Sequence, residues 1–342
     1  MNRILIIACC LFSLNMNAQT KKVTLIKNDA DKKVDVLIDE KPFTSFIFPD
    51  NLEKPVLYPI NAASGTFLTR GFPLKSRDGE RTDHPHHLGY WLNYESVNGL
   101  DFWNNSYAIP AERKSKYGWI RNVKVTEAKS GKAAGTLTYT ANWENQAKNV
   151  LLIETTTFTF SGEANSRTID RVTTLVAQKD TVKFKDIKDG MVGLRLTKEL
   201  EFPSNKVEEF TDAQGNITKV PASGNGASGD YLTSEGKTGV GVWATRGTWC
   251  LLKGTKEGQP LSVAIIDHPK NAGYPTYWHA RDYGLFAANP LGQDVFSNGK
   301  EKLNLTLKPG EKVTFRYRMV ITSNEEINAD KLNSIANNFA KK

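Results

Sequence analysis

The sequence contains little cysteine and, beyond its first residues, no long apolar run. Three cysteines occur among 342 residues, and Cys9 and Cys10 lie close to the N-terminus. If these two are removed with a leader segment, Cys250 has no intramolecular partner, which excludes a disulfide framework and a cysteine-based metal site. Because Trp249 and Leu251 flank Cys250, we expect a buried, inert thiol there. No later segment approaches the roughly 20 apolar residues of a transmembrane helix.

The chain also lacks a block of charge of one sign. Lys and Arg number 45 and Asp and Glu 37, which gives a net charge of +8. Acidic residues interleave with the basic ones, for example at residues 198–201. A spread of this kind indicates a solvated surface and argues against a nucleic-acid partner. We therefore expect no nucleic-acid partner.

The first 18 residues have the pattern of a secretory signal. Arg3 precedes an apolar run over residues 4–14, and a small residue, Ala18, stands at the expected cleavage point. A lipoprotein signal is the less favoured alternative, because only eight residues precede Cys9. We predict a cleavable signal peptide over residues 1–18, a periplasmic location, and one β-sandwich domain over residues 19–342.

Alternating and β-branched segments recur along the mature chain, as half-buried strands require. Those that predict strands are residues 22–26, 34–38, 136–143, 150–160, 167–177, 240–244, 261–266, 302–307 and 312–322. Asn98-Gly99 between Val97 and Leu100 predicts a tight hairpin turn after a strand near residues 87–94. This pattern predicts an all-β fold, a large antiparallel β-sandwich.

One helix is predicted, at about residues 326–340, where Ile327, Leu332, Ile335 and Phe339 recur near helical spacing. We expect it to pack on the outside of a sheet. The polar segment 211–237 is expected to be a loop within the domain. It contains a G-x-G-x-x-G match at residues 224–229, but the flanking residues resemble neither a strand before it nor a helix after it, so no nucleotide site is expected.

All five histidines fall in two short segments. His84, His86 and His87 lie in Asp83-His84-Pro85-His86-His87, and His268 and His279 lie in residues 267–284. Histidine is suited to proton transfer near neutral pH and to metal binding. We therefore predict that the two segments meet in one polar site.

The backbone conformation expected for the two segments limits which of their side chains can point into that site. On an extended segment, side chains alternate, so His84 and His86 would share one face and His87 would point to the other, unless the segment turns. By the same rule His279, Arg281 and Tyr283 would share a face, opposite Asp282.

The predicted catalytic residues supply acid–base groups, oriented carboxylates and an oxyanion-binding guanidinium; they are His84, His86, His279, Arg281, Asp267 and Asp282. Asp101 or Asp170 would be alternative orienting carboxylates. Substrate contacts are predicted from further polar and aromatic residues of the same regions, which are His87, Trp91, Asn98, Asp101, His268, Asn271, Trp278 and Tyr283. No metal ligands are assigned and no cofactor is predicted.

Other interpretations remain open at this point. The histidines could be hydrogen-bonded structural residues, and Trp91, Trp103 and Trp278 core aromatics. Asp83 and Asp267 could only cap turns. A divalent metal held by His84, His86 and either His279 or an acid is a second alternative. A noncatalytic glycan-binding module is a third.

Residues 83–91 with 97–103, residues 189–196, and residues 267–271 with 275–290 resemble signatures of the PmoA-like family of bacterial proteins. Members of that family are often secreted, and they occur in the company of sugar-processing proteins, which implies carbohydrate work. The layout is also similar to the galactose-mutarotase-like super-sandwich, in which a concave sheet binds a sugar and a histidine with a carboxylate moves protons. These resemblances imply an epimerase, a lyase or a glycoside hydrolase, with a small molecule or a glycan as its partner.

Overall fold

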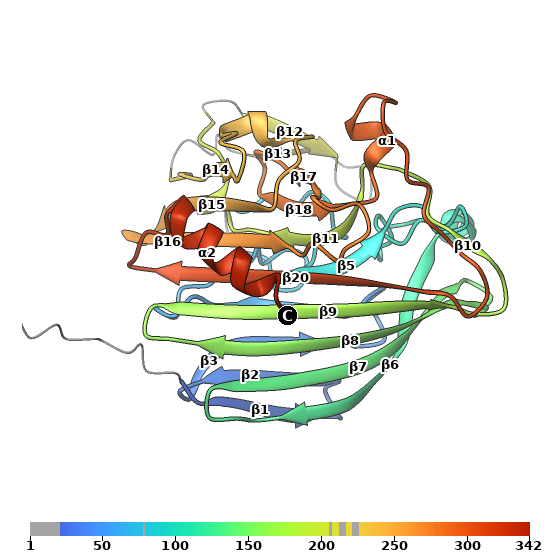
Figure 1. Ribbon diagram of the computed structural model, residues 1–342, viewed down its shortest axis with the longest axis horizontal. Coiled ribbons are helices and arrows are strands. Elements are labelled where there is room, and N and C mark those ends of the chain that lie inside the picture. The colour runs from blue at the N-terminus through green and yellow to red at the C-terminus, as the bar shows by residue number, and fades with distance from the viewer. Residues whose placement is uncertain (1–20, 78, 205–206, 212–216, 221–225) are drawn as a thin grey trace, which may run out of the picture.

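The computed structural model describes residues 21–342 except 78, 205–206, 212–216 and 221–225 (Figure 1). Two eight-stranded sheets dominate it, and every strand pair within them is antiparallel. The predicted all-β sandwich with a C-terminal helix is thereby confirmed. The predicted signal peptide lies outside the described residues, as do Gly224 and Asn225 of the G-x-G-x-x-G match.

The first sheet brings the N-terminal strands together with strands from later in the chain. In spatial order its members are β1 (Val23–Asn28), β2 (Lys33–Ile38), β3 (Lys41–Ile47), β4 (Val56–Ile60), β5 (Tyr90–Tyr94), β11 (Gly190–Arg195), β18 (Leu285–Asn289) and β17 (Tyr277–Ala280). The two histidine segments therefore enter the same sheet, since the first precedes β5 and the second contains β17.

The second sheet contains the longest strands. In spatial order its members are β14 (Asp230–Thr233), β15 (Trp249–Lys256), β16 (Gln259–Asp267), β20 (Lys312–Ser323), β9 (Ser166–Ala177), β8 (Val150–Gly162), β7 (Ala134–Asn145) and β6 (Gly118–Lys129). Along β8 buried Leu152, Phe158 and Phe160 alternate with more exposed residues, as the sequence pattern predicts. These side chains belong to the main hydrophobic core, which also contains Leu92 of β5 and Val36 of β2.

Smaller elements complete the described structure. Two strand pairs stand apart from the large sheets: β10 (Val182–Lys183) with β19 (Thr306–Leu307), and β12 (Glu208–Thr211) with β13 (Ile217–Val220). The helical elements are η1 (Ala111–Lys116), η2 (Lys198–Leu200), η3 (Gly239–Val242), α1 (Gln293–Phe296) and α2 (Ala329–Phe339).

Helix α2 lies on the outer face of the second sheet, in front of β16 and β20 in Figure 1. Its N-cap is Asn328, whose side chain accepts a hydrogen bond from the backbone N–H of Lys331 at 2.9 Å. Leu332 and Phe339 pack with Trp249 and Ile266 in a separate apolar cluster. The predicted helix and its position outside a sheet are confirmed, although it begins three residues later than expected.

Two strand predictions were wrong in part. The predicted strand 240–244 is instead the short helical turn η3 followed by a turn, and Gly239 and Ala244 adopt left-handed φ values of 58° and 61°, outside the range of a β-strand. On a strand Val240 and Val242 would share one face, but Val240 is 73% exposed and Val242 is buried. Of the predicted strand 302–307 only β19 pairs. Cys250 is fully buried, as expected.

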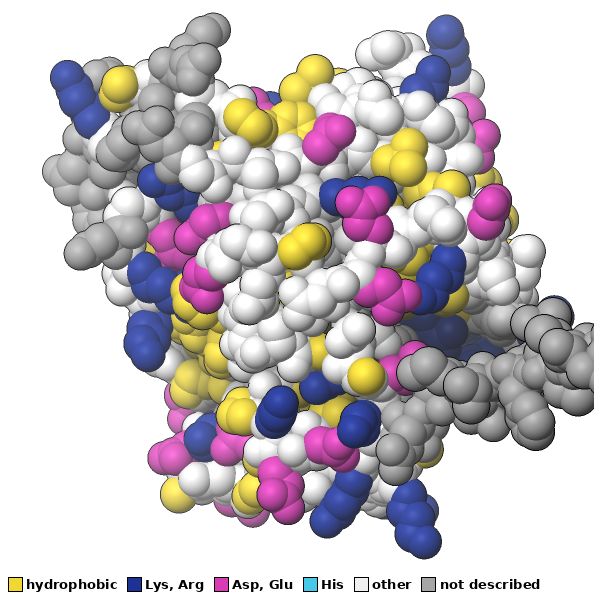
Figure 2. Space-filling view, turned by 90° about the vertical axis from the view of Figure 1, so that its left-hand side faces the viewer, with side chains coloured by type: hydrophobic (Ala, Val, Ile, Leu, Met, Phe, Trp, Pro, Cys, Tyr) yellow, Lys and Arg dark blue, Asp and Glu magenta, His cyan; other side chains and the backbone are white. Residues whose placement is uncertain are grey.

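Basic and acidic side chains are intermingled on the face shown in Figure 2, and of the described residues no histidine is visible there. This distribution agrees with the interleaved charges of the sequence. Among the described residues, no helix combines the length and the apolar character that a membrane crossing requires.

Candidate active site

The first histidine segment forms a tight turn that leads into β5. The backbone N–H of His87 donates to the carbonyl of His84 at 2.9 Å, and His84 adopts a left-handed φ of 46°. The turn overrides the strand-like alternation expected for this segment, so all three imidazoles meet on one side. The ring centroid of His87 lies 4.8 Å from that of His84 and 4.4 Å from that of His86.

Asp83 is buried at the centre of an ionic network. Its Oδ1 accepts hydrogen bonds from Arg70 at 2.7 Å and from Arg195 at 2.9 Å. Burial alone would raise the pKa of this carboxyl, but Arg195, the hydrogen bond from His84 and Arg70 outweigh burial and hold the pKa well below its usual range. Asp83 is therefore a stable anion within the described structure. It does far more than cap a turn.

His84 is oriented by the second oxygen of the same carboxyl. Its Nδ1 lies 2.7 Å from Oδ2 of Asp83, so Nδ1 carries the proton and donates. Within the described part of the chain no hydrogen bond engages Nε2, and the side chain is 34% exposed. His84 is thus placed to exchange a proton with a ligand through Nε2, while the buried Asp83 carboxylate fixes the tautomer and the orientation of its ring.

The other two imidazoles of the turn are buried and neutral. Arg195 donates to Nδ1 of His87 at 3.0 Å, and a guanidinium can only donate, so Nδ1 of His87 is unprotonated. Burial and neighbouring positive charges hold the pKa of His87 and of His86 well below the ordinary value. The Nζ of Lys54 donates a hydrogen bond to the His86 carbonyl at 2.8 Å, which helps to fix the backbone of the turn.

Part of the second segment reaches this turn. The ring of Tyr283 stacks on the imidazole of His84, with centroids 5.2 Å apart and planes 3° apart. The guanidinium of Arg281 lies 5.6 Å from the Tyr283 ring and 5.8 Å from the ring of Trp243. Tyr283 is therefore placed differently from the predicted substrate contact, because the imidazole of His84 covers one face of its ring. Trp243 is 38% exposed and offers the open aromatic surface instead.

Four neighbouring strands place Trp91 and His279 on the same face of the first sheet. Trp91 pairs with Gly193, Gly193 with Ala287, and Ala287 with His279, and residues paired in this way point to the same face. A Cβ on Gly193 would lie 2.6 Å from Cζ2 of Trp91, so the indole rests directly over this glycine. Trp91 and Trp103 form the floor on which His87 packs.

An acidic group adjoins His279. Nδ1 of His279 lies 3.5 Å from Oδ1 of Asp189, and burial lowers the pKa of this imidazole to about 4. Glu95 lies beside Asp189; burial, followed by repulsion from Asp189 and Asp101, raises the pKa of Glu95 to about 7. The group therefore contains a carboxyl that titrates near neutral pH. Asp189 also acts electrostatically on Tyr283, which links this group to the histidine turn.

Three predicted residues of the second segment have structural contacts elsewhere. Oδ1 of Asp267 accepts hydrogen bonds from the backbone of His268 and the side chain of Asn271, and Oδ2 accepts one from Thr276. The ring of His268 packs edge-on against Phe339 of α2, 5.0 Å away. Together these contacts hold a buried turn against the second sheet and its helix, and we leave these residues out of the candidate site.

Five further predicted residues lie outside the candidate site: one is in the core, three are hydrogen-bonded elsewhere and one is solvent-exposed. Trp278 is fully buried in the core between the sheets. Asn98 fills the left-handed hairpin position and bonds to Thr181 and Lys183.

Asp101 accepts hydrogen bonds from Asn104, and burial raises its pKa. Asp282 is exposed next to the Tyr283 stack. Asp170 is occupied by two hydrogen bonds from Arg318, each 2.6 Å long.

The metal alternative requires at least three converging ligands. Among the described residues, no group of three or more His, Cys, Asp or Glu side chains is arranged to hold a metal ion. His84 donates to Asp83 and His279 lies against Asp189, so the proposed ligands point to different partners.

Sequence reasoning missed several residues of the site. Arg70, Arg195 and Lys54 hold the histidine turn in place. Glu95 and Asp189 form the acidic group at His279, and Trp243 lies beside Arg281. Arg195 and Asp189 lie in the segment that resembles a family signature, which was the available signal. Nothing in the local sequence of Arg70, Lys54 or Trp243 distinguishes them from other basic or aromatic residues.

Residues 33–337 match the model of a family described as "Family of unknown function (DUF6807)". The comparisons do not support the PmoA-like name that the sequence signatures suggested. No curated protein matches the chain.

Several solved structures show a remote likeness. A putative aldose 1-epimerase from Escherichia coli K12 is 12% identical over 90% of this chain and 100% of its own, with a TM-score of 0.33. A galactose mutarotase-like protein from Clostridium acetobutylicum is 11% identical over 90% and 99%, with a TM-score of 0.35. The galactosidase domain of an alpha-galactosidase–sucrose kinase is 9% identical over 88% of this chain but only 41% of that protein, with a TM-score of 0.37. At these TM-scores the likenesses transfer neither substrate nor residues.

Proposed function

The chain belongs to this family of unknown function, and we propose that it is a carbohydrate-active enzyme that moves a proton on a sugar through His84. One observation carries the proposal: a half-exposed imidazole, hydrogen-bonded at 2.7 Å to a buried carboxylate that two guanidinium groups fix. A carboxylate on Nδ1 selects the tautomer in which Nε2 can accept a proton.

The neighbouring side chains supply the other functions that such a reaction needs. Arg281 lies between the rings of Trp243 and Tyr283 and would donate to a ring oxygen, a carboxylate or a developing oxyanion. Trp243 would stack on the apolar face of the sugar ring. As in an epimerase, His84 would remove a proton from a hydroxyl or an acidic C–H and return it to the rearranged sugar. As in a lyase, it would remove a C–H proton, a C=C bond would form as the neighbouring C–O bond breaks, and the proton would pass to the departing oxygen.

Hydrolysis fits this arrangement less well. Glycoside hydrolysis generally uses two carboxyl groups on either side of the scissile bond. Glu95 and Asp189 lie next to each other, and Asp83 is engaged by Arg70, Arg195 and His84. An export signal at residues 1–18 would place the enzyme in the periplasm, in agreement with a sugar substrate taken up from outside.

A His84→Gln variant tests the proposal directly. Native protein is incubated with hexoses, uronic acids and glycosides in D₂O, and proton NMR follows epimer formation, elimination or solvent deuterium incorporation. We expect turnover of at least one sugar by the native protein and a loss of about 10²–10⁴-fold in the variant.

His268→Gln is the matched control, because it removes a histidine that packs on α2 away from the proposed site. It is assayed below its unfolding temperature and should retain native turnover. Equal turnover by native protein and a folded His84→Gln variant would contradict the proposal. Tight sugar binding by native protein without any product over long incubation would favour a noncatalytic glycan-binding module.

A further inference from the structure

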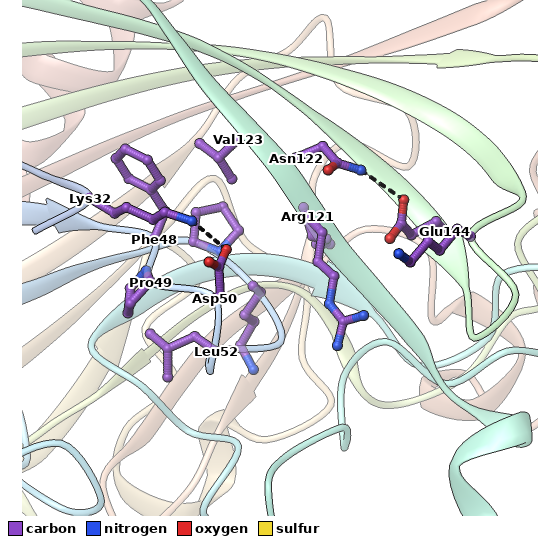
Figure 3. Close-up of a pocket in the computed structure, with 13 residues that line it drawn as sticks. Lys32, Phe48, Pro49, Asp50, Leu52, Arg121, Asn122, Val123 and Glu144 are labelled. Atoms are coloured by element: carbon purple, nitrogen blue, oxygen red, sulfur yellow. Dashed lines mark hydrogen bonds and ion pairs between the residues drawn. The ribbon is translucent and has the colours of Figure 1, made fainter. Parts of the chain in front are cut away.

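A basic pocket lies behind the histidine turn, apart from the proposed site. Its volume is about 430 Å³, within the range of small-molecule sites. Residues 48–55 form one wall, and strand β6 with the end of β7 forms the other (Figure 3). A bulge in β6 after Arg121, where Asn122 adopts a left-handed φ of 55°, lets Arg121, Asn122 and Val123 all line the pocket.

The pocket has more positive than negative charge. Lys32, Lys54, Arg121 and Lys148 line it, against two carboxylates. Lys32 is paired with one of these, Asp50, at 2.5 Å. The other, Glu144, accepts a hydrogen bond from Asn122 at 3.1 Å, and burial raises its pKa. Arg121 stands between these two pairs in Figure 3.

Arg121 is held by packing rather than by a carboxylate. Its guanidinium lies 4.6 Å from the ring of Trp119, and within the described residues no carboxylate comes within ion-pair distance of it. Its Nε is buried and has no hydrogen-bond partner among the described residues. A stacked guanidinium with unused donors is pre-organised for a planar oxyanion, because the ring contact fixes the plane in which its N–H groups point.

We propose that this pocket binds the oxyanion group of a small ligand, with Arg121 as its main contact and Lys148 as a second cation. The volume accommodates a carboxylate-bearing monosaccharide. The inner wall is Lys54, whose Nζ holds the His86 carbonyl and lies 5.6 Å from the Trp91 ring. The pocket therefore adjoins the histidine turn through the side chain of Lys54, and His84 is not among the residues that line it.

Calorimetry with sodium glucuronate, glucose and inorganic phosphate tests the proposal. We expect glucuronate to bind, glucose to bind at least tenfold more weakly to this pocket, and the affinity for glucuronate to fall as salt rises. Arg121→Gln should weaken glucuronate binding at least tenfold. Lys124→Gln, which removes one positive charge from an exposed position of the same strand, should leave the Kd unchanged.

Phosphate binding and an Arg281→Gln variant distinguish the possible binding sites. Phosphate binding that Arg121→Gln abolishes supports the same site and identifies the group as a phosphate. Absence of binding by either anion, or an unchanged Kd in Arg121→Gln, would overturn the proposal. Loss of glucuronate binding in Arg281→Gln but not in Arg121→Gln would also overturn it, since the ligand would then occupy the proposed active site.

The test remains decisive in two difficult cases. If Arg121→Gln does not fold, Lys148→Gln replaces it, and a loss of less than twofold together with salt-independent binding counts against the pocket. His84→Gln should leave glucuronate binding to the pocket intact, so failure of the enzymatic proposal and failure of the pocket proposal are distinguishable.

Discussion

The imidazole of His84 and the phenol ring of Tyr283 stack face to face, with planes only 3° apart, although they come from the two separate histidine segments. This contact joins the turn before β5 to the turn after β17. It also explains why Tyr283 serves to position His84 rather than to offer an open ring to a ligand.

Replacing Asp83 with Asn should destabilise the protein strongly. The change leaves Arg70 and Arg195 buried without their carboxylate, and removal of one partner from a buried ion pair costs about 3–5 kcal/mol. Urea unfolding measures the loss. Asp282→Asn, at an exposed position close by, should change the free energy of unfolding by less than about 0.5 kcal/mol. Similar stability of the two variants would show that the Asp83 network does not hold the turn.

Replacing Trp243 with Ala should weaken sugar binding about tenfold, because the 38% exposed ring surface beside Arg281 is removed. The buried part of the ring packs on Phe296, so the variant should also unfold at a lower temperature, and binding is measured well below that temperature. Calorimetry with the sugar identified by the NMR assay measures the effect. Tyr274→Ala removes an aromatic ring of similar exposure from the turn held by Asp267 and should have no effect on affinity.

Replacing Glu95 with Gln should change how stability depends on pH. Burial, followed by repulsion from Asp189, raises the pKa of Glu95 to about 7 from its ordinary value of 4.5, so folding favours its protonated form. Its stabilising contribution is complete below pH 4.5 and is lost as pH rises through 7.

Glu95→Gln therefore should gain about 1 kcal/mol at pH 8, or a rise in Tm of roughly 2–4 °C, and nothing at pH 4. Thermal unfolding of both proteins at the two pH values tests this expectation. A gain of equal size at both would assign the effect to something other than the Glu95 proton.

Replacing Gly193 with Ala should disturb the floor of the site. The new methyl group would lie 2.6 Å from Trp91 and 2.9 Å from Trp103, so the indoles must shift. We expect a loss of about 1–3 kcal/mol in the free energy of unfolding, with a change in tryptophan fluorescence. Gly241→Ala is the control, because a Cβ there meets no atom within 4 Å. Equal stability of the two variants would show that the indoles of Trp91 and Trp103 accommodate the added methyl group without cost.

The sequence predicted the sheets and the helix well because period and burial agree along β7, β8, β9 and β20. It failed at residues 240–244, where apolar residues predict a strand but the exposed Val240 and the buried Val242 do not share a face. In such a segment, local composition resembles a strand although the backbone turns.

The candidate site was predictable only in part. Clustering of the histidines identified His84 and its neighbours, and the strand alternation expected from His279 onward identified Arg281 and Tyr283. The partners Arg70 and Arg195 were not predictable, because their role depends on two distant chain segments closing around one carboxyl. Conversely, Asp267 and His268 belong to a second Asp-His-Pro tripeptide like that of Asp83 and His84. Their different tertiary environment gives them a structural role.

The single carboxyl of Asp83 balances two guanidinium groups that come from separate parts of the chain. Moving the turn away from the sheet would leave both guanidinium groups buried without their carboxylate, so a partly opened turn is high in free energy. The turn should therefore stay closed, and the imidazole of His84 is already oriented before a ligand arrives.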